Sequence, residues 1–574
     1  MTQAAHPPGL RAAILFGAGQ LGASLDPAGR VMLTAAGICA LAGAALAAGA
    51  PVALKHLVEA LDPAAPAVPA SLSPVFWLCA YVGALGAGKL AGEVRGYCFG
   101  AAEQSISRKL ARRAFEHVLS LPMTALHRHS TGGLVQTLEN GLLGYRLVLQ
   151  HALFTLLPGL AETALIAVLL FHFFDSVLLA VFGACAALYM AVFQDGARRI
   201  LRAGRAVSSA RIGANALLSD GLMNIETVKA FCSEAALAER LDVRLADVQQ
   251  RWRDFYKARF ATGVLVTLVF TAGLGAALWL SASRVEAGSM SLGDLVLVSA
   301  WMLQVIRPLE LAGSGIRDIG QGAAFAGRLN GLLREAAEPA AGASPAFPGL
   351  SGGPPSIRFE HVSFTYPGGR KVLDDVSFEI EAGKVTAIAG PSGSGKSSIL
   401  RLLMRFHEPD EGRILIGGIL VRDYPASEIR KLIAFTPQDA GLLDDSLAFN
   451  ISMPHRVADP RRLEDAARQA MLEEVINRLP DGFETLTGER GARLSGGEKQ
   501  RAAIARALYR QAPIRLADEA TSALDYPAEE RLAANGVFAG GRVTSVIVAH
   551  RAETIALADN VIVLSDGRVV DQGR

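Results

Sequence analysis

Six long apolar runs constrain this chain more than any other feature of its sequence. A helix needs about 20 mostly apolar residues to cross the hydrocarbon core of a bilayer. The runs cover approximately residues 31–54, 74–90, 153–173, 177–193, 260–282 and 292–306. We therefore predict six membrane-spanning helices. The second and the sixth are the weakest, because Lys89 and Arg307 lie at their ends.

The connections between these runs alternate in charge, and this predicts their orientation. Arginines are concentrated between the second and third runs and between the fourth and fifth, whereas the other connections carry little beyond Lys55 and Arg284. Positive residues mark the cytoplasmic side, so both arginine-rich stretches and both chain ends should be cytoplasmic. We interpret residues 1–30 as a cytoplasmic lead-in. Helical periodicity persists in these stretches, so the spans should continue as helices beyond the bilayer.

Composition separates a membrane half from a soluble half. The chain has 574 residues, 51% of them hydrophobic, which predicts at least two domains. We expect a transmembrane domain over residues 31–333, a linker rich in Ala, Gly, Pro and Ser over 334–356, and a soluble α/β domain over 357–574. The net charge of +2 is too small to indicate nucleic-acid binding. The five cysteines are widely spaced, which favours reduced packing residues.

Each cytoplasmic excursion contains one break in its helical pattern. The first break, residues 121–133, contains Pro122 and the pair Gly132-Gly133, and the second lies near residues 220–229. Pro and paired Gly end a helix and allow the chain to reverse. Short transverse helices there could contact the soluble half, and ordinary solvated turns are the alternative.

Polar groups inside membrane spans are costly, so they suggest either a function or a structural ion pair. Glu162 is the acid that lies deepest within a predicted span. We predict a water-filled cavity that accepts a polar or anionic solute from the cytoplasm; a buried structural pair is the equally weighted alternative. The candidate cavity residues are His151, Thr155, Glu162, Gln304 and Arg307.

The soluble half contains a phosphate-binding loop. Residues 390–397 fit the pattern G-x-x-x-x-G-K-[ST], follow an apolar strand and precede a helix, which is the context that the motif requires. Backbone N–H groups of the glycine-rich turn and the start of the helix would bind phosphates. Lys396 would reach the outer phosphates of a nucleotide and Ser397 would ligate Mg²⁺. The loop residues are Gly390, Pro391, Ser392, Gly393, Ser394, Gly395, Lys396, Ser397 and the following Ser398.

Four further signals follow in a fixed order. Gln438 could contact Mg²⁺ or the attacking water, and the turn Ser495, Gly496, Gly497, Glu498 opens a helix as a second anion-binding element. Asp518 and Glu519 end a strand, which suits Mg²⁺ coordination by the first and water activation by the second. His550 follows another strand, where it could sense the γ-phosphate. Tyr366, ahead of the loop, could stack on adenine.

This set of motifs resembles the nucleotide-binding domain of ATP-binding-cassette (ABC) transporters over about residues 357–574. The resemblance implies an all-α six-helix transmembrane domain of the exporter type, followed by an α/β P-loop domain with an added antiparallel sheet and a helical subdomain. It also implies ATP and Mg²⁺ as cofactors, a bilayer and a second half-transporter subunit as partners, and no nucleic acid. Ser495 and Gly497 would then close over the ATP of the other subunit, and Asp525 would lie across that interface.

Patches of the membrane half are similar to the mitochondrial-type and heavy-metal-tolerance half-transporters, which export glutathione-derived or other thiol compounds. The expected function is ATP-driven export of a small polar or anionic solute, with a thiol conjugate as one candidate, by a protein of the bacterial inner membrane. Alternatives are a lipid, drug or peptide exporter, a siderophore importer, or a cassette ATPase without transport. Two departures stand out: Arg515 lies within the strand before the paired acids, and the chain stops at Arg574, before the expected tail helices.

Overall fold

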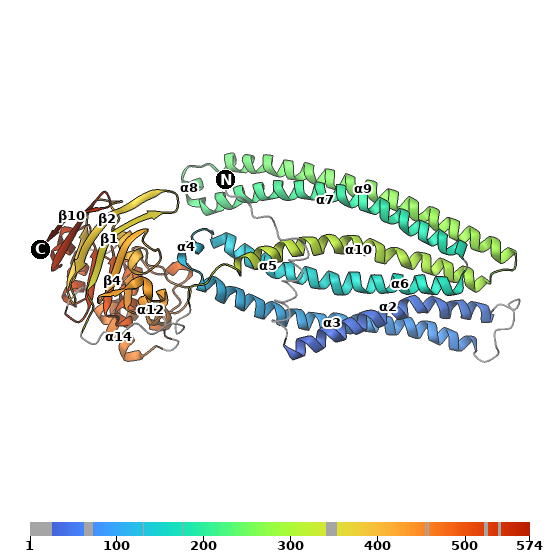
Figure 1. The fold of residues 1–574 in the computed structure, drawn as a ribbon, viewed down its shortest axis with the longest axis horizontal. Helices are drawn as coiled ribbons and strands as arrows, with labels where there is room; N and C mark the ends of the chain where they lie inside the picture. Colours follow the sequence, from blue (N-terminus) through green and yellow to red (C-terminus); the bar gives the residue numbers. More distant parts are fainter. Residues whose placement is uncertain are drawn as a thin grey trace. The chain divides into compact units, whose positions relative to one another are not determined.

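The computed structural model describes residues 26–61, 73–129, 131–174, 176–339, 353–453, 455, 458–521, 526–537 and 541–573 (Figure 1). It divides into two compact units. The helical unit comprises residues 1–116 and 131–334, and the sheet unit comprises residues 117–130 and 335–574. Most of the expected lead-in and the centre of the expected linker lie outside the described residues.

The helical unit consists of long helices joined by short connections. Its helix α5 continues through the π-helix η1 into α6 without a break in the chain. The elements are α2 (Pro27–Leu61), α3 (Pro74–Ser120), α5 (Thr131–His151), η1 (Ala152–Leu156), α6 (Leu157–Phe173), α7 (Ser176–Met223), α8 (Ile225–Ala230), α9 (Glu234–Glu286) and α10 (Leu292–Leu332).

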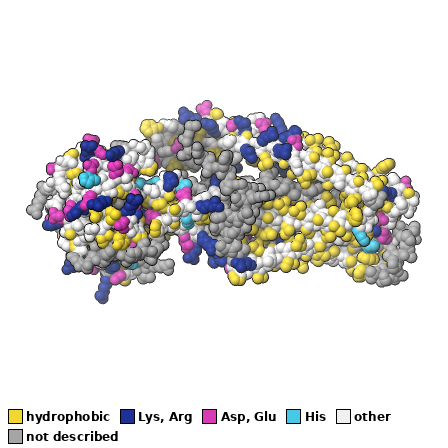
Figure 2. Space-filling view, in the orientation of Figure 1, with side chains coloured by type: hydrophobic (Ala, Val, Ile, Leu, Met, Phe, Trp, Pro, Cys, Tyr) yellow, Lys and Arg dark blue, Asp and Glu magenta, His cyan; other side chains and the backbone are white. Residues whose placement is uncertain are grey.

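Five of the described helical segments are long and apolar enough to cross a membrane, and α10 adds a shorter apolar stretch, Leu292–Val305. Helices α3, α7 and α9 are 47, 48 and 53 residues long, well beyond what a bilayer requires. On the helical unit, Figure 2 shows hydrophobic side chains gathered toward the end where α6 ends and α7 begins, with Lys and Arg toward the other end. The predicted continuation of the spans as longer helices agrees with these lengths.

A stripe of alanines allows α2 to pack closely within the helical unit. Ala36, Ala40, Ala44 and Ala48 recur every four residues and are all at most 5% exposed, so they form one face of the helix. Small residues allow helix backbones to approach where no hydrophobic effect drives their association. Trp301 of α10 fills the space beside this face, and its indole Nε1 donates to the Ala48 carbonyl at 3.0 Å.

Glycines set two other helix contacts. A Cβ atom placed on Gly144 of α5 would lie 2.5 Å from the Gly322 carbonyl oxygen of α10. One placed on Gly196 of α7 would lie 2.1 Å from Cγ2 of Thr262 in α9. Both distances are shorter than any side chain tolerates, so only glycine allows these pairs to pack as they do.

The sheet unit is built on a six-stranded sheet in the order β10-β9-β3-β8-β7-β6, parallel except for β10. Parallel strands in such sheets are covered on both faces and are therefore continuously apolar; every residue of β8 is buried. The strands are β3 (Val385–Ala389), β6 (Ile433–Thr436), β7 (Ile514–Asp518), β8 (Thr544–Val548), β9 (Asn560–Ser565) and β10 (Arg568–Gly573).

A second, antiparallel sheet has the order β2-β1-β4-β5. It consists of β1 (Ile357–Tyr366), β2 (Arg370–Ile380), β4 (Glu411–Ile416) and β5 (Ile419–Leu420). The helices are α11 (Lys396–Leu403), α12 (Ala426–Lys431), α13 (Leu447–Ser452), α14 (Pro460–Gln469), α15 (Glu473–Arg478), α16 (Gly496–Arg510), α17 (Tyr526–Ala534) and α18 (Ala552–Ala556), with the 3₁₀ turns η2 (Val421–Asp423), η3 (Gly482–Glu484) and η4 (Glu489–Gly491).

The short helix α4 (Met123–Leu126), which follows Pro122 in the first predicted break, also belongs to the sheet unit. Ala125 within it is 3% exposed. The N–H of Glu338 donates to the Ser120 carbonyl at 2.8 Å, and the Glu338 carboxylate pairs with Arg430 at 2.7 Å. In the second predicted break, α7 ends at Met223 and α8 begins at Ile225 within the helical unit.

Candidate nucleotide site and membrane cavity

The glycine-rich loop connects β3 to α11. Gly395, the N-cap of α11, has φ +106°, and Gly390 has φ +146°, values that favour glycine. A Cβ atom on Gly390 would also lie 2.1 Å from the Leu564 carbonyl oxygen. The chain therefore needs glycine at both ends of the turn. Pro391, Ser392 and Gly393 are exposed between them.

Lys396 lies buried within this loop. Its Nζ donates to the carbonyl oxygens of Gly390 at 3.0 Å and Pro391 at 2.8 Å. Burial lowers the pKa of the Lys396 ammonium, while Glu519 and Asp518 act in the opposite direction. The Ser394 hydroxyl is buried with no hydrogen-bond partner among the described residues. A buried donor without a partner points to an acceptor supplied by a ligand, and a phosphate oxygen fits.

Asp518, the last residue of β7, lies at the carboxyl end of the sheet beside the loop. The Ser397 hydroxyl donates to Oδ1 of Asp518 at 3.0 Å. Burial raises the pKa of Asp518, the Ser397 hydrogen bond lowers it and the neighbouring Glu519 raises it further. A buried carboxylate beside a hydroxyl is a donor set that suits a hard cation such as Mg²⁺, which would also offset the cost of burying the charge.

Glu519 is held by three side chains that come from different parts of the sequence. Gln438 Nε2 donates to Oε2 at 2.8 Å, His550 Nε2 lies 2.9 Å from Oε1, and Gln500 Nε2 donates to the Glu519 carbonyl at 3.2 Å. Glu519 has φ +48°, an uncommon value outside glycine. The structure thus brings Gln438, Glu519 and His550 together at the edge where Asp518 lies.

Tyr366 ends β1 near the start of α11. Its hydroxyl lies 3.2 Å from the Ser398 Oγ and accepts from Arg401 at 3.3 Å. Its ring meets those of Phe364 and His407 edge-on, with centroids 4.8 and 5.1 Å away. The half-buried ring is therefore fixed on one side by packing, next to the loop that would hold phosphates.

The turn before α16 forms a capping box. The Ser495 Oγ accepts from the N–H of Glu498 at 3.4 Å, and the Glu498 carboxylate accepts from the N–H of Ser495 at 2.8 Å. Burial would raise the pKa of Glu498, but the bonds from Ser495 and the ion pair with Arg478 hold it below its usual value. Ser495 and Gly496 are exposed and Gly497 is half-buried, so this helix start is open to an incoming group.

One predicted residue, Asp525, cannot be placed, and one residue of the site, Gln500, was not predicted. Asp525 lies outside the described residues, as does its segment 522–525. Gln500 was not assigned a role from sequence, although it closes the motif that begins at Leu494. Its contact with the Glu519 carbonyl depends on the packing of α16 against β7. That packing cannot be predicted from a local sequence pattern.

A cavity of about 700 Å³ lies within the helical unit. Thr155, Glu162 and Gln304 line it, together with Lys89 and Arg95 of α3, which sequence reasoning did not select. Its wall is formed by α2, α3, η1, α6 and α10. His151, also predicted as a cavity residue, is not among the described residues of this lining. His151 instead lies 3.3 Å from Asp318 and 3.3 Å from Thr155, and the side chain of Arg307 lies outside the described set.

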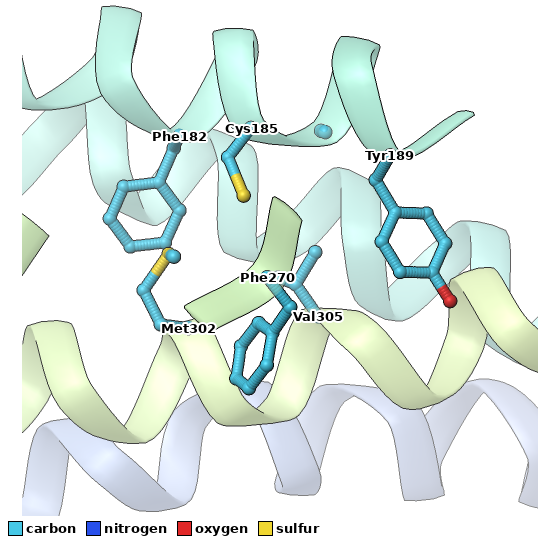
Figure 3. A pocket seen from close by; sticks show the side chains of 7 residues that line it. Phe182, Cys185, Tyr189, Phe270, Met302 and Val305 are labelled. Atoms are coloured by element: carbon cyan, nitrogen blue, oxygen red, sulfur yellow. The ribbon is translucent and has the colours of Figure 1, made fainter. Parts of the chain in front are cut away.

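A second, much smaller pocket of about 20 Å³ lies between α7, α9 and α10. Figure 3 shows Phe182, Cys185 and Tyr189 from α7 facing Phe270 of α9 and Met302 and Val305 of α10. This space is too small for a solute and is lined by hydrophobic and aromatic side chains. It is a packing defect between helices and offers no binding chemistry.

Membrane-length helices joined to a unit with a phosphate loop, a buried aspartate and a neighbouring glutamate define an ATP-driven membrane transporter. Comparisons with known proteins give its family. Residues 33–309 match the ABC transporter transmembrane region and residues 373–522 match the ABC transporter family.

Two relatives carry the name of mitochondrial iron-sulfur clusters transporters. The ATM1 protein of Candida glabrata is 34% identical over 530 residues, covering 91% of this chain and 72% of the relative. The human ABCB7 protein is 34% identical over 487 residues, covering 84% of this chain and 64% of the relative. A solved bacterial Atm1-family ABC exporter with ATP bound superposes with a TM-score of 0.84 at 31% identity over 95% of each chain.

The chain belongs to the ABC transporter family, as an exporter-type half-transporter similar to the Atm1 and ABCB7 proteins. It is a multi-pass membrane protein and an ATPase that couples ATP hydrolysis to transport. The fold class and the resemblance drawn from the sequence are thereby confirmed.

Proposed function

We propose that two copies of this chain, in a bacterial inner membrane with both termini cytoplasmic, export a small polar or anionic solute of the glutathione or thiol-conjugate type. The supporting observation is the cavity whose wall includes Thr155, Glu162 and Gln304 in otherwise apolar helices. Polar groups at this depth are retained where they contact a solute or water. The printed names of the relatives, iron-sulfur clusters transporters, favour a substrate linked to thiol or metal chemistry.

In the proposed reaction, ATP binds over the glycine-rich loop and Lys396 turns from the Gly390 and Pro391 carbonyls to its outer phosphates. Ser397, Asp518 and Gln438 would hold Mg²⁺, which when bound neutralises phosphate charge. Glu519 orients the attacking water and accepts its proton at a carboxylate oxygen, while Tyr366 stacks on adenine. His550, already 2.9 Å from Glu519, keeps that carboxylate oriented and contacts the γ-phosphate.

The proposal involves two chains because the second phosphate-binding element, Ser495 to Glu498, exposes Ser495 and Gly496 at the start of α16, away from the glycine-rich loop in sequence. Its N–H groups and helix dipole suit an anion. Each nucleotide would then be held between the loop of one subunit and this turn of the other, with Asp525 at the same interface. Closure would be transmitted to the helices through α4 and α8.

Transport in inside-out vesicles tests this function. Reconstituted protein should accumulate glutathione disulfide or a glutathione conjugate in an ATP-dependent manner, and these solutes should stimulate its ATPase activity. Glu162→Gln should reduce the stimulation while leaving basal hydrolysis intact. Accumulation of a lipid, drug or peptide instead, or siderophore movement in the opposite direction, would replace the proposed substrate. Stimulation unchanged in Glu162→Gln would assign Glu162 a structural role.

A further inference from the structure

Arg95 of α3 is a cavity residue that neither the sequence nor the proposed ATPase site explains. It lines the 700 Å³ cavity, five residues beyond the predicted end of the second span. Charged side chains in this part of a membrane protein are rare unless they pair with another group or face a substrate path. A specific role for its guanidinium must therefore be sought inside the cavity.

The guanidinium is oriented by an aromatic stack. Its central carbon lies 4.7 Å from the ring centroid of Phe154, and the ring of Phe99 meets that of Phe154 edge-on at 4.5 Å. Phe154 lies in the π-helix η1, where the wider turn changes the direction of the side chains relative to an α-helix. A cation–π contact fixes the plane of a guanidinium and leaves its N–H donors unused.

Those donors are not satisfied within the described structure. The Arg95 Nε is buried without a hydrogen-bond partner, and so is the Oε1 of Gln304, which lines the same cavity. An unpaired buried polar atom costs about 1–3 kcal/mol, and more when it is charged. Two such atoms in one cavity indicate a ligand that supplies what the protein lacks.

The charge of the cavity identifies the chemistry of that ligand. Among the described residues that line it, the charged ones are Lys89, Arg95 and Glu162, so cations outnumber acids in this set. A planar guanidinium with unused N–H groups matches a carboxylate, which it can bind through two parallel hydrogen bonds. We infer that Arg95, oriented by Phe154, binds a carboxylate of the transported solute and thereby determines which solutes the cavity accepts. This inference rests on the proposed function and names the group of the solute that is recognised.

Binding to the full-length protein in phosphatidylcholine nanodiscs tests the assignment without ATP hydrolysis. Titrations of glutathione disulfide and of citrate, followed by calorimetry, should give a dissociation constant that rises about tenfold or more in Arg95→Gln, the loss expected for a charged hydrogen bond. Arg95→Lys, which keeps the charge but not the planar fork, should be intermediate. Esterified glutathione disulfide should bind wild type and Arg95→Gln equally weakly.

Arg253→Gln removes an exposed arginine outside the cavity lining and is the matched control. It should bind as wild type does. Arg95→Met, which preserves packing against Phe154, distinguishes lost binding from lost folding because its thermal midpoint should stay near that of the wild type while its affinity falls. Equal affinity of Arg95→Gln and wild type, or no carboxylate binding by the wild type, overturns the assignment.

The outcomes also separate this inference from the proposed function. Carboxylate binding through Arg95 without vesicle accumulation would remove the transport proposal and keep the subsite. If Arg95→Gln transports glutathione conjugates with an unchanged half-saturating concentration, the transport proposal is kept and the Arg95 subsite is lost. An effect of Arg95 that appears only when phosphatidylglycerol is added, with no response to solute, overturns the inference and assigns the guanidinium to a lipid phosphate.

Discussion

The rings of His127 and His407 stack with their centroids 5.8 Å apart and their planes 19° apart. His127 follows α4, whereas His407 lies 280 residues later and is 5% exposed. His407 in turn meets the Tyr366 ring edge-on. A continuous series of ring contacts therefore joins the α4 segment to the tyrosine expected to stack on adenine.

Substitution of His407 should weaken nucleotide binding through Tyr366. Aromatic contacts contribute about 1 kcal/mol beyond burial, so His407→Ala should raise the dissociation constant for ATP several-fold. A fluorescent ATP analogue measures this directly. His361→Asn, an exposed position whose positive φ asparagine tolerates, is the control and should leave the constant unchanged. Unaltered affinity in His407→Ala would show that Tyr366 is positioned without it.

The same contact predicts a pH dependence. Burial, followed by His127 and Arg401, lowers the pKa of His407 below its usual value of about 6.5. The folded state therefore favours the neutral ring, and its stability contribution is present above about pH 6.5 and lost as the pH falls through the lowered pKa. The thermal midpoint should fall more steeply below pH 6.5 for wild type than for His407→Phe. Parallel curves would contradict this.

Glu519→Gln should abolish hydrolysis and preserve ATP binding. The amide keeps the size of the side chain but cannot accept a proton, and loss of a general base costs about 10²- to 10⁴-fold in rate. Single-turnover hydrolysis and retention of labelled ATP measure the two effects. The exposed Glu530→Gln should behave as wild type. Rapid turnover by Glu519→Gln would mean that another group activates the water.

Ser495→Arg should stop ATP turnover if two subunits share each nucleotide. A large cation on the exposed turn would block closure over the partner's phosphates and remove the Ser495 cap, whose loss costs about 1 kcal/mol. Gln572→Arg, on the exposed end of β10, adds the same charge elsewhere and should be neutral. Full activity of Ser495→Arg, or of a single chain isolated in a nanodisc, contradicts the dimeric site.

Arg515 should tolerate a neutral substitute better than an acidic one. Its guanidinium donates to the Val537 carbonyl, and burial lowers its pKa. Arg515→Met removes a largely buried charge, which is stabilising, and loses that hydrogen bond, which is destabilising. The free energy of unfolding should therefore change by about 1 kcal/mol or less. Arg515→Glu should lower the free energy of unfolding by about 3 kcal/mol or more, because it places an unpaired acid at this position of β7. Thermal unfolding compares the two.

The glycine contact between α5 and α10 predicts a steric effect. Gly144→Ala would place a methyl group 2.5 Å from the Gly322 carbonyl oxygen, and overpacking of this kind costs about 1–3 kcal/mol. Gly183→Ala in α7 meets no atom within 4 Å and should be neutral or slightly stabilising. Thermal midpoints in one detergent distinguish them, and equal midpoints would show that the two helices can separate at no cost.

Much of this architecture could be predicted because its signals are local. The phosphate loop is written in consecutive residues from Gly390 to Ser397, and the apolar runs report spans directly. The convergence of Gln438, Gln500 and His550 on Glu519 depends on strand order, which no local pattern records. Gln438 and His550 could be selected because each follows a predicted strand, but their contacts with Glu519 could not be predicted.

Arg95 shows a different limit. The apolar pattern predicts that the second span ends near Leu90, and the arginines that follow it indicate only the orientation of the helix. In the structure α3 continues to Ser120, and Arg95 lines the cavity with its guanidinium over the ring of Phe154 in η1. A π-helix differs from an α-helix by one residue in a turn, and no residue type specifies it. The side chains that face the cavity could therefore not be assigned by counting helical periods.

The meeting of Gly144 with Gly322 also limits how the protein can move. No side chain lies between the two backbones at this point, so relative sliding of α5 and α10 would bring main-chain atoms into collision. Helix α5 continues directly into η1. A movement of α10 that carried α5 with it would therefore reach the wider π-helical turn beside Phe154.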